Sequence, residues 1–242
     1  LKNCRSQNFI FLRVVTQSNL TRPSACKSEA QRDVNLISEL SAAKVDMFPT
    51  EAGSVSVGNG VYLWLIAKYF SPKTVLEIGT YIGRSALALL FGGRLSISEL
   101  YTCDGSYDCL SFSDYKNEGF GADREKIIDR IKYFGKTSST DVLKKIDNEG
   151  KKLDLIFIDG RISPEDCQLF SQVMSPNCVF VLDDFEGIEK GVVNAIMLRN
   201  VFRGTMLIEP PVDNGDEIGN LALIVPTHII KLSRQQNVPV NM

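Results

Sequence analysis

The residues whose types and spacing say most about chemistry lie in one turn of the 242-residue sequence, Glu77-Ile78-Gly79-Thr80-Tyr81-Ile82-Gly83-Arg84-Ser85. Gly79 and Gly83 stand four apart, and Glu77 precedes the first glycine by two positions. A dinucleotide site would place G-x-G-x-x-G here, to bring backbone amides to a pyrophosphate. The observed spacing suits a cationic, phosphate-free nucleoside lying over the glycines, with the carboxylate orienting the turn or binding an ammonium group. The alternative is a tight strand-to-helix turn with a buried glutamate.

Three carboxylates follow two later apolar runs. Asp159 comes after Phe157-Ile158, and the pair Asp183-Asp184 comes after Val181-Leu182. Because like charges at neighbouring strand ends repel one another, we expect a positive group between them. Oxygen ligands without His or Cys suit a hard cation such as magnesium or manganese. The alternative is that these acids cap loops and contact cofactor amides.

Two further polar stretches follow apolar runs. Asp104, in Cys103-Asp104-Gly105-Ser106, could accept both hydroxyls of a ribose. The stretch 136–141 offers the hydroxyls of Ser138, Ser139 and Thr140 and nearby backbone N–H groups to the edge of an adenine. The alternatives are an ordinary Asp turn and a Ser/Thr helix cap.

The elements that must position these residues alternate along the chain. Continuous apolar strands separated by helices predict a parallel sheet covered on both faces, and strands joined without a helix predict an antiparallel end. The fold class is therefore α/β: a doubly wound, mostly parallel seven-stranded sheet with an antiparallel last strand. Predicted strands are 74–78, 100–103, 131–134, 153–158, 178–182, 205–208 and 221–225. Predicted helices are 29–47, 61–70, 85–91, 123–131, 140–146, 164–174 and 188–200, with a loop at 53–60.

Composition excludes several classes of protein. Hydrophobic residues make up 44% and charged residues 23%, as in a globular protein, and no apolar run approaches the roughly 20 residues of a membrane span. A net charge of -2 argues against nucleic acid as a partner. The six scattered cysteines predict reduced core thiols in a cytoplasmic protein, and the apolar run 9–15, interrupted by Arg13, is not expected to be a signal peptide.

The sequence resembles the class I S-adenosylmethionine-dependent methyltransferases, whose first motif, E/D-x-G-x-x-x-G, is matched by Glu77, Gly79 and Gly83. The closer resemblance, over about residues 50–225, is to small-molecule O-methyltransferases similar to catechol O-methyltransferase, which have a Val-Gly turn where this chain has Val57-Gly58. The resemblance implies S-adenosylmethionine as cofactor. The residues that it implies for binding are Val57, Gly58, Glu77, Gly79, Thr80, Tyr81, Gly83, Ser85, Asp104, Gly105, Ser106, Ser138, Ser139, Thr140 and Asp159.

The same resemblance implies a magnesium ion at the reactive side. Asp159 and Asp183 match its two Asp ligands, and Asp184 stands where that family has Asn, so these three acids are the expected metal ligands and catalytic residues. A metal would lower the pKa of a bound hydroxyl and align it with the sulfonium methyl. The sequence departs from the family at Ile162, where Lys or His is the usual base. Arg161 stays protonated, so deprotonation falls to the metal, to an acid or to no group.

We therefore predict an N-terminal arm and helix at 1–50 and a methyltransferase domain at 51–242. It would transfer a methyl group from S-adenosylmethionine to a hydroxyl of a small molecule, assisted by a divalent metal. Alternatives are a metal-independent N- or sugar O-methyltransferase and a non-catalytic cofactor-binding protein; the glycine spacing disfavours a nicotinamide oxidoreductase. The helix at 29–47 would cover the pocket or join a homodimer. The aromatic stretch 107–120 would be a lid or a surface loop. His228 is expected to be structural or exposed.

Overall fold

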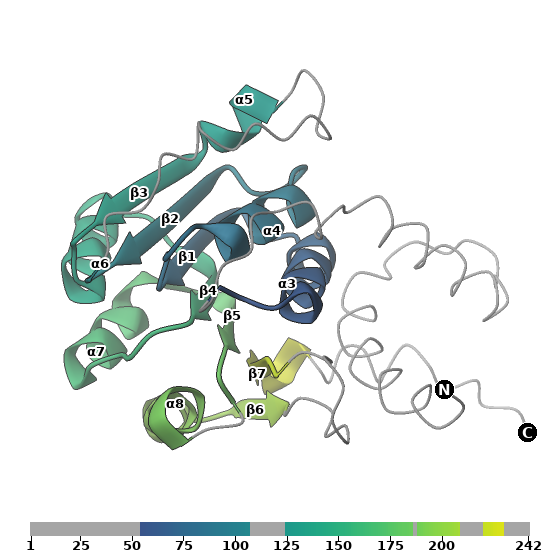
Figure 1. Ribbon diagram of the computed structural model, residues 1–242. Helices are drawn as coiled ribbons and strands as arrows, with labels where there is room; N and C mark the ends of the chain where they lie inside the picture. The colour runs from purple at the N-terminus through teal and green to yellow at the C-terminus, as the bar shows by residue number, and fades with distance from the viewer. Residues whose placement is uncertain (1–53, 107–123, 186–187, 209–219, 230–242) are drawn as a thin grey trace, which may run out of the picture.

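Seven strands form one sheet in the computed structural model, which describes residues 54–106, 124–185, 188–208 and 220–229. The sheet order is β3-β2-β1-β4-β5-β7-β6 (Figure 1). Strands β1 to β5 are parallel, and β7 runs antiparallel to both β5 and β6, as the sequence predicts. The strands are β1 Thr74–Ile78, β2 Glu99–Asp104, β3 Ile131–Gly135, β4 Leu153–Ile158, β5 Met174–Leu182, β6 Thr205–Ile208 and β7 Ala222–Pro226.

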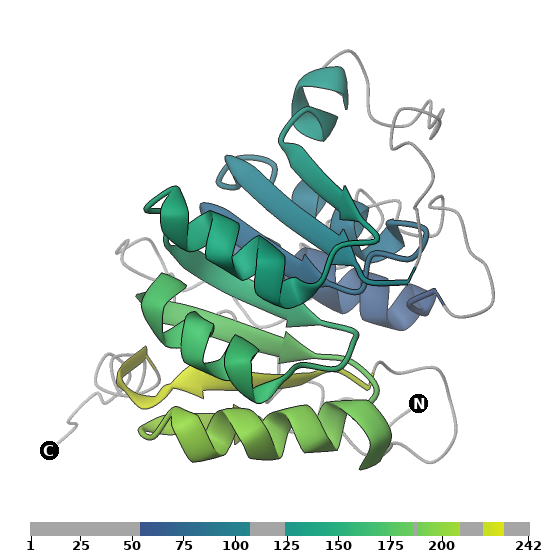
Figure 2. The same ribbon diagram turned by 90° about the vertical axis from the view of Figure 1, so that its left-hand side faces the viewer.

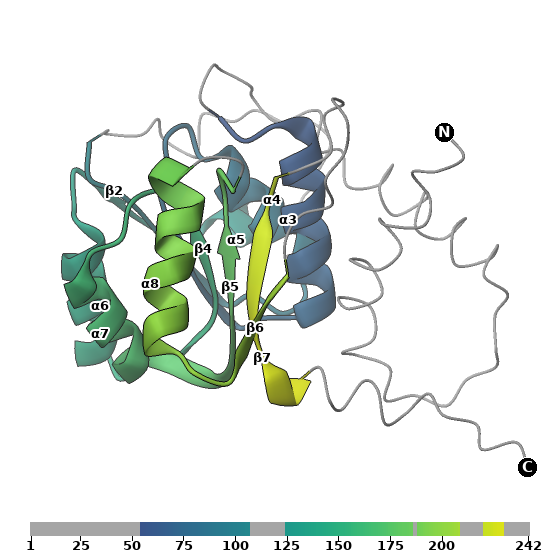
Figure 3. The same cartoon turned by 90° about the horizontal axis from the view of Figure 1, so that it is seen from below.

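Helices cover both faces of this sheet. Helices α3 and α4 lie on one face, and α6, α7 and α8 lie on the other (Figures 2 and 3). No helix in the described ranges is long and apolar enough to cross a membrane. The helical elements are α3 Val57–Phe70, α4 Arg84–Gly92, α5 Arg124–Ile128, α6 Ser139–Asn148, α7 Pro164–Val173, the π-helical turn η4 Ile188–Val192, and α8 Val193–Val201.

The hydrophobic core has two halves, one on each side of the sheet. Successive residues of β4 alternate between them: Leu155 and Phe157 pack with α3 and α4, while Ile156 and Ile158 pack with α6, α7 and α8. This alternation follows from the two-residue period of a strand, and it explains why the strand is apolar at every position. The described cysteines, Cys103, Cys167 and Cys178, are free and buried in or beside this core, as predicted.

Several predicted bounds need correction. The predicted loop at 53–60 contains the start of α3, because the Ser56 side chain accepts a hydrogen bond from the Asn59 amide and caps a helix that begins at Val57. Ile131 pairs with Leu100 as a strand residue, so the helix predicted at 123–131 is only the short α5. Strand β5 begins at Met174 rather than at 178, after an irregular register against β4.

Other predictions lie outside the described residues. These are the N-terminal arm with the helix at 29–47, and the aromatic stretch at 107–120. The division of the chain at residue 50 stays a prediction for the same reason. In the described part, the predicted helix at 188–200 is divided into the π-helical turn Ile188–Val192 and α8 Val193–Val201.

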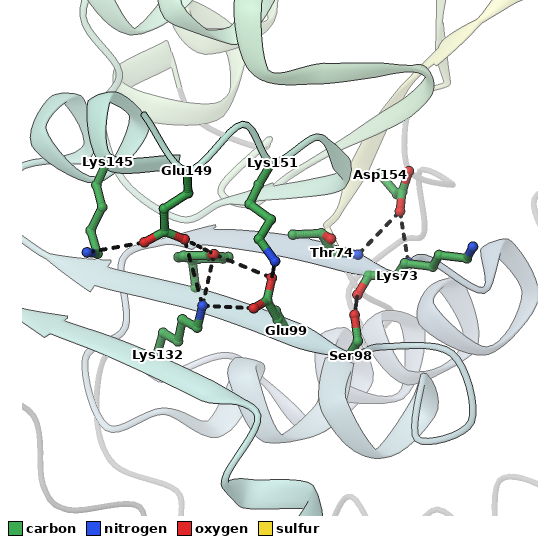
Figure 4. A network of polar contacts seen from close by, with 10 residues as sticks. Lys73, Thr74, Ser98, Glu99, Lys132, Lys145, Glu149, Lys151 and Asp154 are labelled. Atoms are coloured by element: carbon green, nitrogen blue, oxygen red, sulfur yellow. Dashed lines mark hydrogen bonds and ion pairs between the residues drawn. The ribbon is translucent and has the colours of Figure 1, made fainter. Parts of the chain in front are cut away.

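A polar network fastens the amino ends of β2 and β3 to the end of α6 (Figure 4). Glu99 pairs with Lys132 at 2.8 Å and with Lys151 at 2.9 Å, and the hydroxyl of Tyr101 donates to Glu149 at 2.7 Å. These ion pairs lie at the strand ends opposite to those that carry the motif residues. Their role is therefore to hold the framework, which leaves the other edge of the sheet for chemistry.

Candidate cofactor and acceptor site

The motif residues meet at the carboxyl ends of β1, β2, β4 and β5. Backbone hydrogen bonds tie each strand's following residue to its neighbour: the Gly79 amide donates to Cys103 at 2.9 Å, the Asp159 amide to Ile78 at 2.9 Å, and the Asp183 amide to Ile158 at 3.0 Å. The sheet reverses its winding between β1 and β4. In open α/β sheets, this switch point is where ligands bind.

The glycine turn after β1 is close to the neighbouring strand end. Gly79 has a φ of 100°, and a Cβ at this position would lie 2.6 Å from the backbone oxygen of Asp159. Gly83 has a φ of 83° and donates its amide to Thr80 at 2.7 Å. Only glycine allows both the positive φ and the close approach to Asp159 at position 79. The turn therefore keeps a surface of bare backbone that a ligand can approach.

Asp104 holds this turn against the end of β2. One carboxylate oxygen accepts the Tyr81 amide at 3.0 Å, and the other accepts the Ser106 amide at 2.9 Å. The side chain is buried, whereas Gly105 and Ser106 are exposed. Each carboxylate oxygen has a second lone pair, so Asp104 is fixed by the backbone and can still accept hydroxyl donors from a ribose.

Glu77 lies buried beneath the turn. The Thr102 hydroxyl donates to its Oε2, and the Thr80 hydroxyl lies 2.6 Å from that of Thr102. Its Oε1 has no hydrogen-bond partner within the described residues. Burial raises the pKa of Glu77 from 4.5 to about 7. Ser85 is buried in the first turn of α4.

These features fit a nucleoside cofactor that carries positive charge. The turn offers bare backbone at Gly79, a fixed acid at Asp104, and a buried acid with an unpartnered oxygen at Glu77. An anionic pyrophosphate would meet two carboxylates here, which disfavours it electrostatically. The donor set therefore agrees with the cofactor implied by the sequence, S-adenosylmethionine.

The second half of the site is an acid group formed by Asp159, Asp183 and Asp184. The sequence predicts that these side chains converge, and the structure brings them together around the ammonium of Lys190. Lys190 Nζ lies 2.7 Å from Asp184 Oδ2 and 3.7 Å from Asp159 Oδ1. The positive group expected between the acids is thus a lysine that sequence reasoning missed.

Charge and burial shift the pKa values in this group. Burial and the nearby Asp183 raise the pKa of Asp159 from 3.8 to about 8, and Lys190 offsets part of the increase. The hydrogen bond to Asp184 raises the pKa of Lys190 above its usual value of 10.5. The ammonium is therefore positively charged at neutral pH.

The predicted metal ligands do not form a metal centre by themselves. Across residues 54–106, 124–185, 188–208 and 220–229, no group of three or more His, Cys, Asp or Glu side chains is arranged to hold an ion. Asp183 Oδ1 accepts hydrogen bonds from Asn59 Nδ2 at 2.8 Å and from the Asp184 amide at 2.9 Å. Lys190 engages the other two acids, so the donor set as arranged does not fit magnesium.

Asn59 connects the start of α3 to the acid group and to the residues before β7. Its side-chain NH₂ group donates to Asp183 and, at 2.6 Å, to the side-chain oxygen of Asn220. The backbone amide of Asn220 in turn donates to the side-chain oxygen of Asn59 at 3.0 Å. This buried link was not predicted, although Asn59 belongs to the Val57-Gly58-Asn59-Gly60 stretch. Gly58 lies in the first turn of α3, beside Asn59, and the side chain of Val57 is outside the described part.

The hydroxyls predicted to face adenine have protein partners. Ser138 caps α6 by accepting the Asp141 amide at 3.1 Å, as the alternative interpretation holds. Ser139 and Thr140 both donate to Asp166 on α7, at 2.9 and 2.6 Å. A role of these residues in binding adenine stays a prediction. Asp166 was missed, although the Ser163-x-x-Asp166 capping box could have indicated it.

The residues considered for the role of general base do not fill it. Ile162 is buried in the core, and Arg161 is exposed with its guanidinium 3.9 Å from Glu189. His228 is exposed, one of the two outcomes expected for it, and its Nε2 lies 2.8 Å from Asn177 Oδ1, near the amino end of β5. The site therefore has no histidine, and its one lysine comes from η4 in the described residues.

Comparison with known proteins finds similarity to methyltransferases. The sequence pattern of a family described as a methyltransferase domain matches residues 76–185. A curated protein from Mycobacterium sp. (strain JLS), provisionally named an O-methyltransferase, is 26% identical over 141 residues, which are 58% of this chain. The chain spans 60% of the length of that relative.

Two solved structures share the fold. An O-methyltransferase from Bacillus cereus in complex with S-adenosylhomocysteine aligns with a TM-score of 0.52 at 19% identity, over 87% of this chain and 96% of that one. TomG from Streptomyces achromogenes, an O-methyltransferase involved in tomaymycin synthesis, aligns in complex with S-adenosylmethionine with a TM-score of 0.53 at 18% identity, over 89% and 96%.

The sheet order, the glycine turn and the family match over residues 76–185 make this region similar to class I methyltransferase domains. The curated relative and both solved structures are named as O-methyltransferases, and the chain is similar to each of them. The fold class and the resemblance inferred from the sequence are both confirmed.

Proposed function

We propose that this protein is an S-adenosylmethionine-dependent O-methyltransferase that acts on a hydroxyl of a small molecule. The observation that carries the proposal is the adjacency of two unlike halves at one sheet edge. The cofactor half contains Gly79 and Asp104, and the acid group with Lys190 follows β4 and β5. The Asp159 backbone, at the Gly79 turn, joins the two halves.

In this proposal, the cofactor supplies the reactive methyl on a sulfonium. Asp104 and the Gly79 turn hold the nucleoside end, and the buried carboxyl group of Glu77 lies below the turn. The acid group and Lys190 bind the acceptor oxygen, so the transfer gains mainly from positioning. As the new carbon–oxygen bond forms, the carbon–sulfur bond breaks and its electron pair stays on sulfur. The hydroxyl proton passes to one of the acids or to water.

The proposal does not include the predicted divalent metal, because the acid group as arranged does not fit such an ion. The assay therefore measures whether transfer depends on a metal. The rival functions are distinguished by product. An N- or sugar-methylated product would favour a metal-independent enzyme of a different acceptor class, and cofactor binding with no product would favour a non-catalytic protein.

The test is a transfer assay with the full chain, isotopically labelled S-adenosylmethionine and a panel of phenols, catechols, sugars and amines, each with and without EDTA. Mass spectrometry would locate the methyl group. O-methylation of a phenol or catechol supports the proposal. Failure to methylate any member of the panel by a folded protein that binds the cofactor would contradict it.

A further inference from the structure

Resting on the proposed function, we propose that Lys190 is a built-in cation that replaces the divalent metal at the acid group and binds the acceptor oxygen directly. The transfer then requires no metal, and the acceptor needs a single hydroxyl rather than two neighbouring ones. The argument uses the contacts of Lys190, the packing that fixes it, and the donors left on its ammonium.

Lys190 stands where a charge is needed. Three carboxylates, on Asp159, Asp183 and Asp184, surround one edge of the site, and Lys190 makes ion pairs with the first and the last of them. The neighbouring Arg161 is directed to Glu189 instead, at 3.9 Å. Within the described residues, Lys190 is therefore the cation in ion-pair contact with Asp159 and Asp184.

The backbone holds Lys190 in this position. Gly191, the next residue, packs so closely that a Cβ would lie 2.4 Å from the backbone oxygen of Asp183 and 2.8 Å from that of Asp184. Asp184 itself has a φ of 53°, which turns the chain sharply after β5. The π-helical turn is thus pressed onto the strand end, and the lysine it carries points over the acids.

The ammonium keeps donors for a ligand. It has three N–H groups, and the hydrogen bond to Asp184 uses one. Its side chain is 41% exposed, so it also faces the solvent from which an acceptor would arrive. A divalent ion would bind two acceptor oxygens, as in catechol-type enzymes, whereas an ammonium donor can position one oxygen and stabilise the negative charge on it.

The first experiment measures metal binding, which does not depend on catalysis. Mn²⁺ would be titrated into the full chain and followed by electron paramagnetic resonance. Wild type and the control Lys144→Met, which removes an exposed lysine paired with Glu165, should bind no ion at the acid group. Lys190→Met should gain one Mn²⁺ per chain, because Asp159 and Asp184 then lose the ammonium group that pairs with them. Adding Asp159→Ala, which removes one of the expected metal ligands, should abolish that gain.

The second experiment measures transfer in EDTA on any acceptor that the wild type methylates. Wild type and Lys144→Met should keep their activity. Lys190→Met should lose about 100-fold in kcat, a loss of the size that misplacement of a reacting group causes, because the ammonium no longer holds the acceptor oxygen in line with the methyl group. Lys190→Arg, which keeps the charge, should recover part of the lost activity. Mn²⁺ added in excess of the EDTA should partly restore Lys190→Met. S-adenosylhomocysteine affinity should change less than twofold, because Lys190 does not belong to the cofactor half.

Three results would overturn this inference. They are stoichiometric Mn²⁺ binding by the wild type, loss of its transfer in EDTA, and equal behaviour of Lys190→Met and Lys144→Met in both experiments. The first two need no variant, so they decide the matter even if Lys190→Met does not fold. If the wild type transfers no methyl at all, the proposed function fails, while the Mn²⁺ titration still tests the lysine.

Discussion

Replacing Glu77 with glutamine should change how stability depends on pH. Burial raises the pKa of Glu77 from 4.5 to about 7 in the folded protein. The folded state therefore binds this proton more tightly than the unfolded state, and the stabilisation is complete below pH 4.5 and is lost as the pH rises through 7. The difference between the two pKa values corresponds to about 3 kcal/mol of unfolding free energy.

Glutamine has nearly the shape of glutamate and stays neutral. Between pH 4 and pH 8, the free energy of unfolding of Glu77→Gln should therefore rise relative to wild type by about 3 kcal/mol. Urea denaturation at closely spaced pH values measures it. Glu165→Gln, at an exposed residue of α7, is the matched control and should parallel the wild type. A difference between Glu77→Gln and wild type that does not vary with pH would refute the reasoning.

Two further substitutions test the packing of the site. Gly79→Ala should lower the free energy of unfolding by about 2 kcal/mol, because the backbone is left-handed and the methyl would clash with Asp159. Gly150→Ala, with a φ of 65° and open space around it, is the control for the backbone alone and should cost less in the same urea assay. Asp166→Ala removes a buried acceptor of three hydrogen bonds and should cost about 3 kcal/mol, seen as a lower melting temperature. No change in melting would contradict that role.

The fold was predictable because its strands carry strong signals. Thr74–Ile78, Leu153–Ile158 and Thr205–Ile208 match the predicted bounds to the residue. The first two are apolar runs buried on both faces and bounded by turn residues. The start of β5 was missed because Pro176 and Asn177 are exposed and do not resemble a buried strand.

The site was only partly predictable. A sequence shows which residues follow each strand, but it does not show which side chains from other segments contact those residues. The convergence of Asp159 and Asp183 followed from neighbouring strand ends. Lys190 follows Asp184 by six positions, and only the π-helical turn with its close packing at Gly191 brings its ammonium over the acids. The proposed replacement of a metal by Lys190 thus depends on a contact that only the tertiary structure brings about.

The engagement of Ser139 and Thr140 by Asp166 is likewise a contact between two helices. The capping box at Ser163 marks Asp166 as a residue of the first turn of α7, but it gives no sign that the same carboxylate also reaches α6. Hydroxyls in a polar turn can therefore serve the framework as well as a ligand, and the sequence alone does not separate the two.

The most direct measurement is a calorimetric titration of the full chain with S-adenosylhomocysteine, in wild type and in Asp104→Asn. The asparagine can accept only one of the two amides that Asp104 holds, because its NH₂ group meets the other N–H. We predict one saturable site in the wild type and an affinity about tenfold weaker in the variant. A folded wild-type protein that binds no S-adenosylhomocysteine would contradict the central claim, and equal affinities would contradict the assigned role of Asp104.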